Sequence, residues 1–307
     1  MNNNQPLTVS HCFEWNLIPD EAVRNFLSEF AWNGVKNLTF TEHQGFRFLR
    51  EEEYFSSFCK MASEFGIAIE DVHAPCGKEY DLDIPHKDAH EKLVAAHKKC
   101  IEHYAASGVK TYTVHIGAAP YVWEYEGKKW DLEELRPWAV RTLEELFPAA
   151  EKAGLVICVE NSFEPPNTPD EVLYYVNYFD SPVIRCCFDA GHANYMRGKG
   201  KELARYAQSF RENVWRNDLL WEDAPLDKML PFMVTCHLHD NDGYSDAHIL
   251  PGKGTGPWEE VLAKLAEAPH LISIQNEARN AKYAIPIGEA AGVFREMEAK
   301  LETYRKN

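Results

Sequence analysis

Eight short apolar runs alternate with helical segments along the chain, and this alternation limits the fold more than any other feature. The runs begin near residues 7, 35, 67, 109, 155, 183, 233 and 271. Helical patterns lie between or after them, over residues 20–32, 51–65, 87–107, 132–153, 170–178, 258–268 and 287–305. Strands that alternate with helices pair in parallel. Eight such units in ~250–300 residues predict an α/β fold of the (β/α)8 barrel type.

A doubly wound open sheet is the structural alternative. That fold usually carries a GxGxxG turn after its first strand, and no such turn follows the first run here. Because no linker or change of composition divides the chain, we expect one domain over residues 1–307. The stretch 195–231 is longer than a simple crossover needs, and its charges and tryptophans predict an inserted helix pair. It would form a lid, a dimer contact or only an extended crossover. The sequence therefore leaves open whether the protein is a homo-oligomer.

The charge balance disfavours one class of partner. The chain has 32 Lys and Arg residues against 48 Asp and Glu residues, a formal charge of −16 at pH 7. Binding to a phosphate polyanion normally needs a basic face, so nucleic acid is disfavoured. The first ten residues are neither a basic leader nor an apolar core, and no segment approaches the ~20 apolar residues of a membrane helix. We therefore expect a soluble, cytoplasmic protein that does not contact the membrane.

The cysteines do not suggest cross-links. They occur without CxxC pairs, and several lie within apolar runs, as small core residues do. We expect neither a disulfide framework nor a zinc ribbon from the eight residues Cys12, Cys59, Cys76, Cys100, Cys158, Cys186, Cys187 and Cys236.

Polar residues close most of the predicted strands, and a barrel points all its strands at one face. Imidazole or carboxylate groups follow six of the eight runs, namely His73, His115, Glu160, Asp189 with His192, His237 with the pair Asp246 and His248, and Glu277. A lone histidine at a strand end is more often hydrogen-bonded than metal-bound. A carboxylate that closes an apolar run, as Glu160 and Asp189 do, must be paired, hydrogen-bonded or metal-bound. If the barrel is right, we expect at least four of these groups to converge as ligands.

The densest group of candidate ligands lies in residues 236–256, CHLHDNDGYSDAHILPGKGTG. Alternation along the preceding strand sends His237 and His239 to one face, where imidazole can bind zinc, manganese, iron or cobalt. Asp240, Asp242 and the glycines could equally do no more than form turns. The loop 251–256 could hold a phosphate with its backbone N–H groups and the Lys253 ammonium, or its glycines could serve tight turns.

Other polar and aromatic residues have weaker assignments. We expect a solvated surface for the histidines on the helical run 87–107 and just before it, which are His86, His90, His97 and His103. His43, in the expected loop TEHQG, is near enough in sequence to a strand end to reach the site. The segment YVWEYEGKKW after the fourth strand could stack on a sugar or cover the barrel mouth.

Five motifs, in this order, resemble those of the xylose-isomerase-like TIM-barrel superfamily of sugar isomerases and epimerases: VHAP, TVHIG, CVEN, FDAGHAN and HLHDNDGYSDAHILPGKGTGPW. That superfamily also includes type IV apurinic endonucleases, inosose dehydratases and ketose 3-epimerases. The resemblance covers the third to the eighth strand, and the block after the seventh strand is its most specific part. It implies a TIM barrel that holds a divalent metal ion such as zinc, manganese, cobalt or magnesium.

Carried over residue by residue, the resemblance implies a metal site of Glu160, Asp189, His237 and Glu277. Glu160 and Glu277 match the glutamates that act as acid and base in ketose 3-epimerases. His192, in the DxxH pattern after Asp189, is implied to bind a substrate hydroxyl or a second metal. Type IV endonucleases hold three zinc ions, and their additional ligands match His73, His115, His192, Asp246 and His248. The expected substrate contacts are His192, His73, His115 and Lys253, and the expected ligands of a second metal are His192, Asp246 and His248.

The chain departs from the family pattern at two places. The eighth run ends ISIQNEA, so Gln275 and Glu277 both alternate onto the inner face, and a shift of two residues would put Gln275 in the ligand position. The spacing from Trp258 favours Glu277. Ketose 3-epimerases place an arginine soon after the seventh-strand histidine, whereas this chain has Asp240, Asp242 and Gly243 there. That departure puts a ketose substrate in doubt.

The resemblance therefore implies an isomerase or epimerase of a sugar or sugar phosphate that depends on a divalent metal. Such an enzyme forms an enediolate by proton transfer next to a carbonyl. The alternatives are a type IV endonuclease-like phosphodiesterase with several zinc ions, an inosose-dehydratase-like lyase, and a sugar-binding barrel without catalysis. The expected partner is a small sugar or a polyol-derived molecule.

Overall fold

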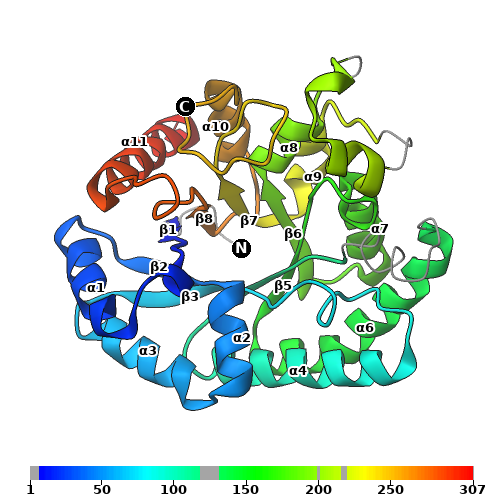
Figure 1. Cartoon of the computed structure of the whole chain (residues 1–307), viewed down its shortest axis with the longest axis horizontal. Coiled ribbons are helices and arrows are strands. Elements are labelled where there is room, and N and C mark those ends of the chain that lie inside the picture. The colour runs from blue at the N-terminus through cyan, green and yellow to red at the C-terminus, as the bar shows by residue number, and fades with distance from the viewer. Residues whose placement is uncertain (1–6, 118–130, 199–200, 216–219, 307) are drawn as a thin grey trace.

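The computed structural model describes residues 7–117, 131–198, 201–215 and 220–306 and confirms the closed parallel barrel (Figure 1). Each strand pairs in parallel with the next, and β8 pairs with β1 to close the ring. All eight strands lie within the apolar runs predicted from the sequence. They are β1 (Thr8–His11), β2 (Asn37–Phe40), β3 (Ala68–His73), β4 (Thr111–Val114), β5 (Val156–Glu160), β6 (Ile184–Asp189), β7 (Met233–Leu238) and β8 (Ser273–Asn276).

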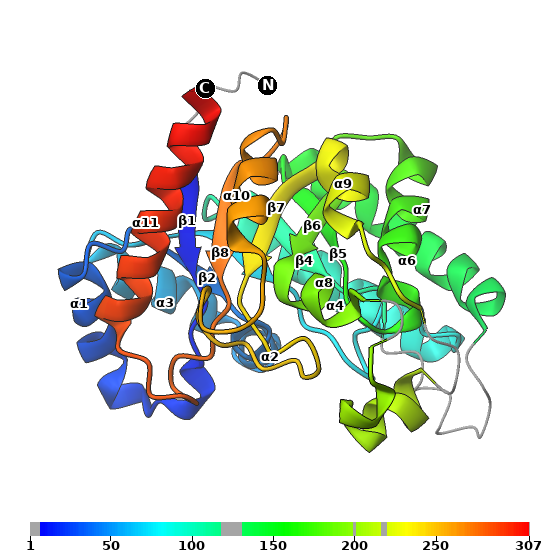
Figure 2. The same cartoon turned by 90° about the horizontal axis from the view of Figure 1, so that it is seen from above.

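Helices surround the barrel, and the predicted helical segments are confirmed with small shifts at their ends. The helices are α1 (Val23–Trp32), α2 (Glu42–Arg50), α3 (Glu53–Ser63), α4 (Lys87–Ala105), α6 (Leu132–Ala153), α7 (Pro169–Phe179), α8 (Ala190–Met196), α9 (Pro225–Met229), α10 (Trp258–Ala266) and α11 (Ile287–Lys306). Figure 2 shows α10 and α11 beside β8 and β1, where the ring closes.

None of the described helices is long and apolar enough to cross a bilayer. All eight cysteines carry free thiols.

Helix α2 replaces the loop expected for TEHQG. It begins with a capping box in which the Thr41 N–H donates to Gln44 Oε1 at 3.1 Å. This Thr-x-x-Gln spacing satisfies backbone donors at the first turn, and it is the signal by which the sequence could have revealed the helix.

The helix α4 corrects a second expectation, because two of its histidines are buried rather than solvated. His90 and His97 are 0% and 1% exposed. His97 Nε2 lies 2.8 Å from the carbonyl oxygen of Tyr80, and Nδ1 lies 2.7 Å from the hydroxyl of Tyr112. Since a carbonyl only accepts, Nε2 carries the proton and Nδ1 accepts from the tyrosine. Charged neighbours in the sequence made these two positions look exposed. In the structure, α4 turns His90 toward α6 and His97 toward the barrel.

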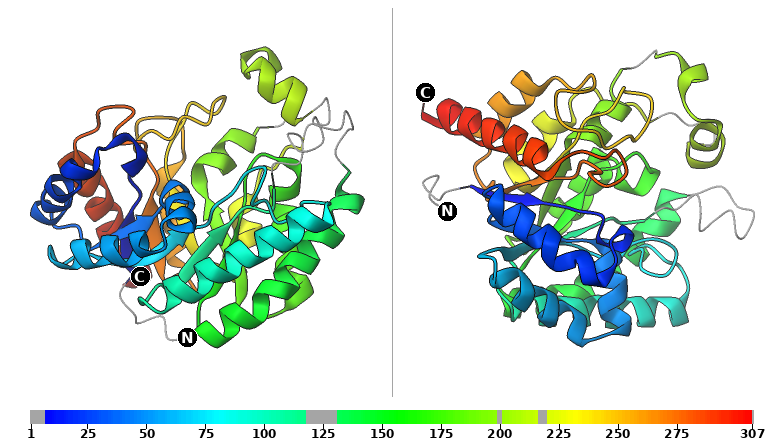
Figure 3. Two further views of the ribbon diagram at one scale, coloured as in Figure 1. Left: turned by 60° about the horizontal axis from the view of Figure 1, so that its bottom comes forward. Right: turned by 60° about the vertical axis from the view of Figure 1, so that its left-hand side comes forward.

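The stretch after α8 has its own small core. In its described part it forms the turns η4 (Leu203–Arg205) and η5 (Phe210–Val214) and the helix α9, rather than the predicted pair of regular helices. Aromatic side chains bury one another there, chiefly Tyr195, Tyr206, Phe210 and Trp215. Figure 3 shows the yellow-green segment of this stretch standing out from the barrel. Phe163 joins the cluster to the barrel mouth, because its ring contacts both Phe210 and His192.

A layer of polar side chains crosses the barrel interior, where aliphatic residues are usual. Asp71 on β3 accepts hydrogen bonds from Ser10 at 2.6 Å, Thr111 at 2.5 Å and Ser273 at 2.9 Å. Ser273 lies on β8, which is not a neighbour of β3, so these bonds span the interior. The layer satisfies a carboxylate that is 1% exposed and ties the two sides of the barrel together.

The burial of His97 predicts a pH-dependent stability. Burial lowers the pKa of His97 to about 4, so between about pH 6.5 and pH 4 only the unfolded chain binds this proton. The free energy of unfolding should therefore fall as the pH drops through this window, by on the order of 3 kcal/mol from this group. We expect His97→Gln to reduce stability at pH 7 and to flatten this pH dependence, measured by urea unfolding with chelator present. Equal slopes for the two proteins would contradict the argument.

Candidate metal centre and active site

Four side chains from four successive strands meet at the carboxyl end of the barrel. Glu160 and Asp189 end β5 and β6, His237 lies on β7, and Glu277 directly follows β8. One ligand atom from each lies within 4.8 Å of the others. His237 Nδ1 is 3.2 Å from Glu160 Oε1 and 3.1 Å from Glu277 Oε1. The structure thus brings together the four residues that the resemblance implies as a metal site.

Gln275 and Glu277 have different environments, and only Glu277 joins this group. The Gln275 amide is fully buried inside the barrel, where its oxygen accepts from Thr39 at 3.0 Å and its nitrogen donates to Thr235 at 2.9 Å. These bonds connect Gln275 to the interior polar layer. The strand register therefore places Glu277, as the spacing from Trp258 favoured, beside His237.

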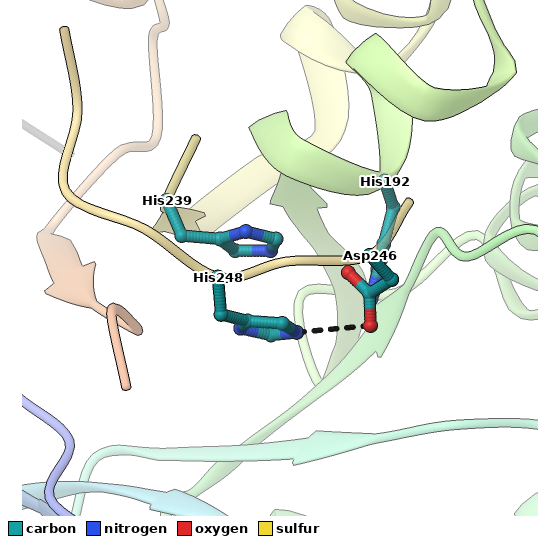
Figure 4. Close-up of side chains that lie close together, drawn as sticks. All are labelled: His192, His239, Asp246 and His248. Atoms are coloured by element: carbon teal, nitrogen blue, oxygen red, sulfur yellow. Dashed lines mark hydrogen bonds and ion pairs between the residues drawn. The ribbon is translucent and has the colours of Figure 1, made fainter. Parts of the chain in front are cut away.

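Besides a group that adds only Cys187 to Glu160 and His237, two further groups of possible ligands adjoin the first. His73 and His115 point their Nε2 atoms at Glu160 Oε2, at 3.4 and 3.2 Å. The other group contains His192, Asp246 and His248, as predicted, and also His239 (Figure 4). Glu160 belongs to both the first group and the His73 group, so one carboxylate links them.

The histidine tautomers fit a cation. Nδ1 lies 3.0 Å from a backbone carbonyl in each of His73, His192 and His248, the partners being Ala74, Asn161 and Glu277. Nδ1 therefore carries the proton, and the Nε2 lone pair is free, which is the arrangement of a metal-binding imidazole. In each case that lone pair faces a carboxylate oxygen at 3.1–3.6 Å. Two acceptors, an imidazole lone pair and a carboxylate oxygen, face each other there, and a bound cation or a proton would relieve their repulsion.

Unsatisfied buried atoms support the same fit. Both carboxylate oxygens of Glu160 and both ring nitrogens of His237 have no hydrogen-bond partner among the described residues. Their mutual distances are short, but the geometry is not that of a hydrogen bond. Buried polar atoms are normally satisfied, and carboxylate with imidazole is a donor set for zinc, manganese or cobalt. The residues of the first group therefore fit a divalent ion.

The electrostatics of the site demand positive charge. Burial disfavours charged His192, but the carboxylates of Asp189, Asp246 and Glu160 outweigh it and raise the pKa of His192 to about 10. Burial likewise acts against protonated His73, yet Glu160 raises its pKa to about 9. Burial would raise the pKa of Glu160, but the imidazoles of His237 and His115 hold it well below its usual range. These shifts show how strongly the carboxylates attract a cation.

His239 contacts Asp189, although it was not among the ligands that the resemblance implied. Its Nε2 donates to Asp189 Oδ2 at 3.1 Å, and its ring stacks on His248 with the centroids 3.6 Å apart (Figure 4). The ring passes so close to Gly191 that a Cβ there would lie 2.0 Å from it. Gly191 in the FDAGHAN motif is therefore needed for close packing, which no side chain would permit.

The glycine-rich loop 251–256 encloses Asp240 and leaves no N–H cradle for a phosphate. The Asp240 carboxylate is fully buried. It accepts from the backbone N–H groups of Asn241, Gly252, Gly254 and Gly256 at 2.8–3.0 Å and from Trp258 Nε1 at 2.7 Å. The backbone of Asp240 also pairs with Ile249, which holds the loop that carries Asp246 and His248. The glycines serve a tight turn around a carboxylate, which was the alternative to phosphate binding.

A cavity of about 540 Å³ opens onto these groups. Of the residues implied by the sequence, it is lined by Glu160, Glu277, His73, His115, His192, Asp246 and His248. His43 lines it as well, from the first turn of α2. Asp189, His237 and His239 do not line it, because they are buried beneath it. Lys253 lies outside the lining, where its exposed ammonium pairs with Glu289 at 3.3 Å.

Several cavity residues were not expected from the sequence. They follow the first, second and eighth strands and are Cys12, Glu14, Glu42, Arg279 and Lys282. The rule that strand ends converge could have identified them, but their strands end in residues that are also common on surfaces. The aromatic segment YVWEYEGKKW, residues 121–130, lies outside the described residues.

A closed parallel barrel with carboxylate and imidazole donors gathered at its carboxyl face defines a TIM-barrel protein with a candidate metal centre. A family model, the xylose isomerase-like TIM barrel, matches residues 26–297, and the chain belongs to that family. It is 30% identical over 173 residues to an uncharacterized protein of Methanocaldococcus jannaschii, which is 53% of this chain and 50% of the relative. The chain thus spans about half the length of the curated relative it matches.

Three solved structures have the same fold. A D-tagatose 3-epimerase-like protein has a TM-score of 0.70 at 19% identity and covers 98% of this chain and 99% of its own. D-psicose 3-epimerase with D-tagatose from Clostridium cellulolyticum H10 has a TM-score of 0.67 at 15% identity, with 95% and 99% covered. The IolI protein with a bound zinc atom has a TM-score of 0.65 at 15% identity, with 96% and 98% covered. At these identities the likeness is one of fold.

The enclosure of Asp240 predicts a positioning role for that carboxylate. In Asp240→Asn an amide NH2 would face N–H donors, and we expect the free energy of unfolding to fall by roughly 2–4 kcal/mol. Urea unfolding of metal-free protein measures the effect.

The matched control is Asp242→Asn. Asp242 is exposed and accepts from Tyr244, Ser245 N and Ser245 Oγ through Oδ1 alone, which an asparagine oxygen can replace. Its stability should change by about 0.5 kcal/mol or less. Equal stability of the two variants would show that the enclosure of Asp240 has little effect.

Proposed function

We propose that this protein is an isomerase or epimerase that depends on a divalent metal and moves a proton next to the carbonyl of a sugar. One observation carries the proposal: Glu160 and Glu277 line the cavity, whereas Asp189 and His237 lie fully buried beneath it. The first pair can touch a substrate and the second pair cannot. This matches a division into two acid/base carboxylates and two metal anchors.

Each residue then has a separate task. A divalent ion held by Glu160, Asp189, His237 and Glu277 would supply Lewis-acid polarisation of the substrate carbonyl. One of the two glutamates accepts the proton from the carbon next to the carbonyl, and the electrons of that C–H bond move toward the carbonyl oxygen to form an enediolate. A glutamate then returns the proton. Return to the former carbonyl carbon, with the hydroxyl proton passing from the neighbouring oxygen to the former carbonyl oxygen, isomerises the sugar. Return to the other face of the same carbon epimerises it.

The remaining cavity histidines can orient hydroxyl groups. Nδ1 of His192 donates to the carbonyl of Asn161, which leaves Nε2 as an acceptor at the cavity. A cavity of about 540 Å³ falls in the ~300–1,000 Å³ range typical of small-molecule sites. The printed names of the similar structures, a D-tagatose 3-epimerase-like protein, a D-psicose 3-epimerase and a zinc-containing IolI protein, support a sugar substrate and a metal for this chain.

A type IV endonuclease-like hydrolase with several zinc ions is the second candidate. The observation that favours it is the presence of four adjoining or overlapping groups of possible ligands, three of which include Glu160. A single-metal isomerase needs only one of them. The charge of the cavity acts against a DNA substrate, because its lining has six carboxylates, Glu14, Glu42, Glu160, Glu164, Asp246 and Glu277, against the two cations Arg279 and Lys282. An inosose-dehydratase-like lyase would share the proton abstraction and differ in expelling a hydroxyl group.

Replacement of the two glutamates tests the main proposal. We expect Glu160→Gln and Glu277→Gln each to lower kcat by roughly 100-fold or more, because an amide cannot accept the substrate proton. The assay is a screen of ketoses, aldoses and inositol-derived ketones for isomerisation, epimerisation or dehydration, with solvent deuterium incorporation as the readout of proton exchange. Unchanged turnover and deuterium incorporation in Glu160→Gln would overturn the assignment.

The number of bound metal ions separates the two candidates. Metal analysis of the purified chain should give one ion per chain for the isomerase, with loss of activity on chelation and recovery on adding zinc, manganese or cobalt. Three ions per chain together with cleavage of an apurinic site would favour the hydrolase. In the same measurement His248→Ala should leave a stoichiometry of one ion per chain unchanged and should lower a stoichiometry of three. The reason is that His248 belongs only to the group with His192, His239 and Asp246.

A further inference from the structure

Two cations, Arg279 and Lys282, line the cavity without a partner. Neither the Arg279 guanidinium nor the Lys282 ammonium forms a hydrogen bond or ion pair with any described residue. The ammonium lies only over the Tyr283 ring, 5.0 Å from its centroid. Arg279 is two residues after Glu277, so the chain segment that carries a proposed catalytic carboxylate also carries these cations.

A shortage of carboxylates does not explain why Arg279 and Lys282 form no ion pair with the described residues. The chain has 48 Asp and Glu residues for 32 Lys and Arg residues. Several cations elsewhere have partners, as in Arg47 with Asp20 at 2.6 Å and Lys110 with Glu70 at 2.7 Å. In the cavity, the nearby carboxylate of Glu14 is instead bound by backbone N–H groups of Ala281 and Lys282, at 3.0 and 3.1 Å.

The backbone that presents the two cations is held in place. Besides the two bonds to Glu14, the Arg279 N–H donates to the His248 carbonyl at 2.8 Å. Ala278 between Glu277 and Arg279 is buried, and its N–H donates to the Asn276 side chain at 3.0 Å. A segment fixed in this way binds a ligand with little loss of backbone freedom. Two cations that form no ion pair with a described residue are therefore presented on a fixed backbone in the cavity that holds Glu160 and Glu277.

We propose that the substrate carries an anionic oxygen group, a phosphate or a carboxylate, and that Arg279 binds this group through its guanidinium fork. Lys282 adds a second positive charge at the same end. This inference rests on the proposed function, since it places the substrate's reacting carbon at Glu160 and Glu277 and its anionic group at Arg279. It also assigns to Arg279 the anion contact that the sequence suggested for Lys253, which lies outside the cavity lining.

The test compares matched ligand pairs on the metal-loaded full chain. The pairs are D-ribulose with D-ribulose 5-phosphate, D-fructose with D-fructose 6-phosphate, and D-glucose with D-glucuronate, so the phosphate and carboxylate sources are separate arms. The variants are Arg279→Met, which keeps length and removes the charge, and Arg279→Lys, which keeps the charge and loses the fork. Lys60→Met on the exposed face of α3 removes one positive charge away from the cavity and is the control.

We expect wild type to bind the anionic member of at least one pair tenfold or more tightly, by titration calorimetry. Arg279→Met should lose that preference by about 10- to 100-fold while its affinity for the neutral member stays unchanged. Arg279→Lys should fall between the two, and Lys60→Met should match wild type. No anionic preference in any pair, or a preference that survives in Arg279→Met, would overturn the proposal.

Turnover of the same ligands separates this proposal from the proposed function. A preference that depends on Arg279, without isomerisation, epimerisation or deuterium exchange of any ligand, would support the anion site and contradict the isomerase assignment. Turnover of a pair in which the anionic and the neutral member have the same kcat/KM, in wild type and in Arg279→Met alike, would support the isomerase assignment and contradict the anion site.

Discussion

The meeting of carboxylates and imidazole lone pairs at the barrel mouth is the constraint on which the rest of the structure depends. Glu160, Asp189 and Glu277 approach His237, and the free Nε2 atoms of neighbouring histidines face further carboxylate oxygens. In a buried site of low dielectric this arrangement is stable only with positive charge between the groups. The parallel pairing of β5 through β8 in the curved sheet holds Glu160 and Glu277, from strands that are not neighbours, close to the same imidazole.

Layers of hydrogen bonds hold these groups in place from below and from the side. Inside the barrel, Asp71 and Gln275 form hydrogen bonds with serine and threonine side chains of other strands. They occupy the interior that aliphatic residues would otherwise fill. Beside the site, Asp240 gathers the glycine-rich loop, and His239 packs on Gly191 while it binds Asp189. These polar groups are thus satisfied internally, whereas the carboxylate oxygens of Glu160 and the ring nitrogens of His237 are left without a hydrogen-bond partner among the described residues. Rigid support of this kind is what a preorganised site requires.

Much of the fold and of the central site could be predicted from the sequence, and particular residues show where prediction stopped. The eight apolar runs mark the strands because parallel barrel strands are buried on both faces. Glu160 and Asp189 stand out because a carboxylate that ends such a run needs a partner. His90 and His97 look like surface residues among lysines and glutamates, and only the packing of α4 buries them. The helix α2 was hidden in a short polar segment, although its capping box was visible. The sequence likewise did not show that Asp240 occupies its own glycine loop.

The sequence by itself determined the barrel, because strand-length apolar runs are a local pattern, and polar residues at the ends of those runs indicated where a site would form. The resemblance to the family then implied Glu160, Asp189 and His237 as candidate ligands and left Gln275 as a rival of Glu277. Tertiary structure alone decided between Gln275 and Glu277, since both alternate onto the same face and only the bonds of Gln275 to Thr39 and Thr235 separate them. It also decided that Arg279 rather than Lys253 lines the cavity. The physical reason is that a residue's distance from a site on the far side of a closed barrel depends on strand register and loop path, which are set by contacts between segments remote in the chain.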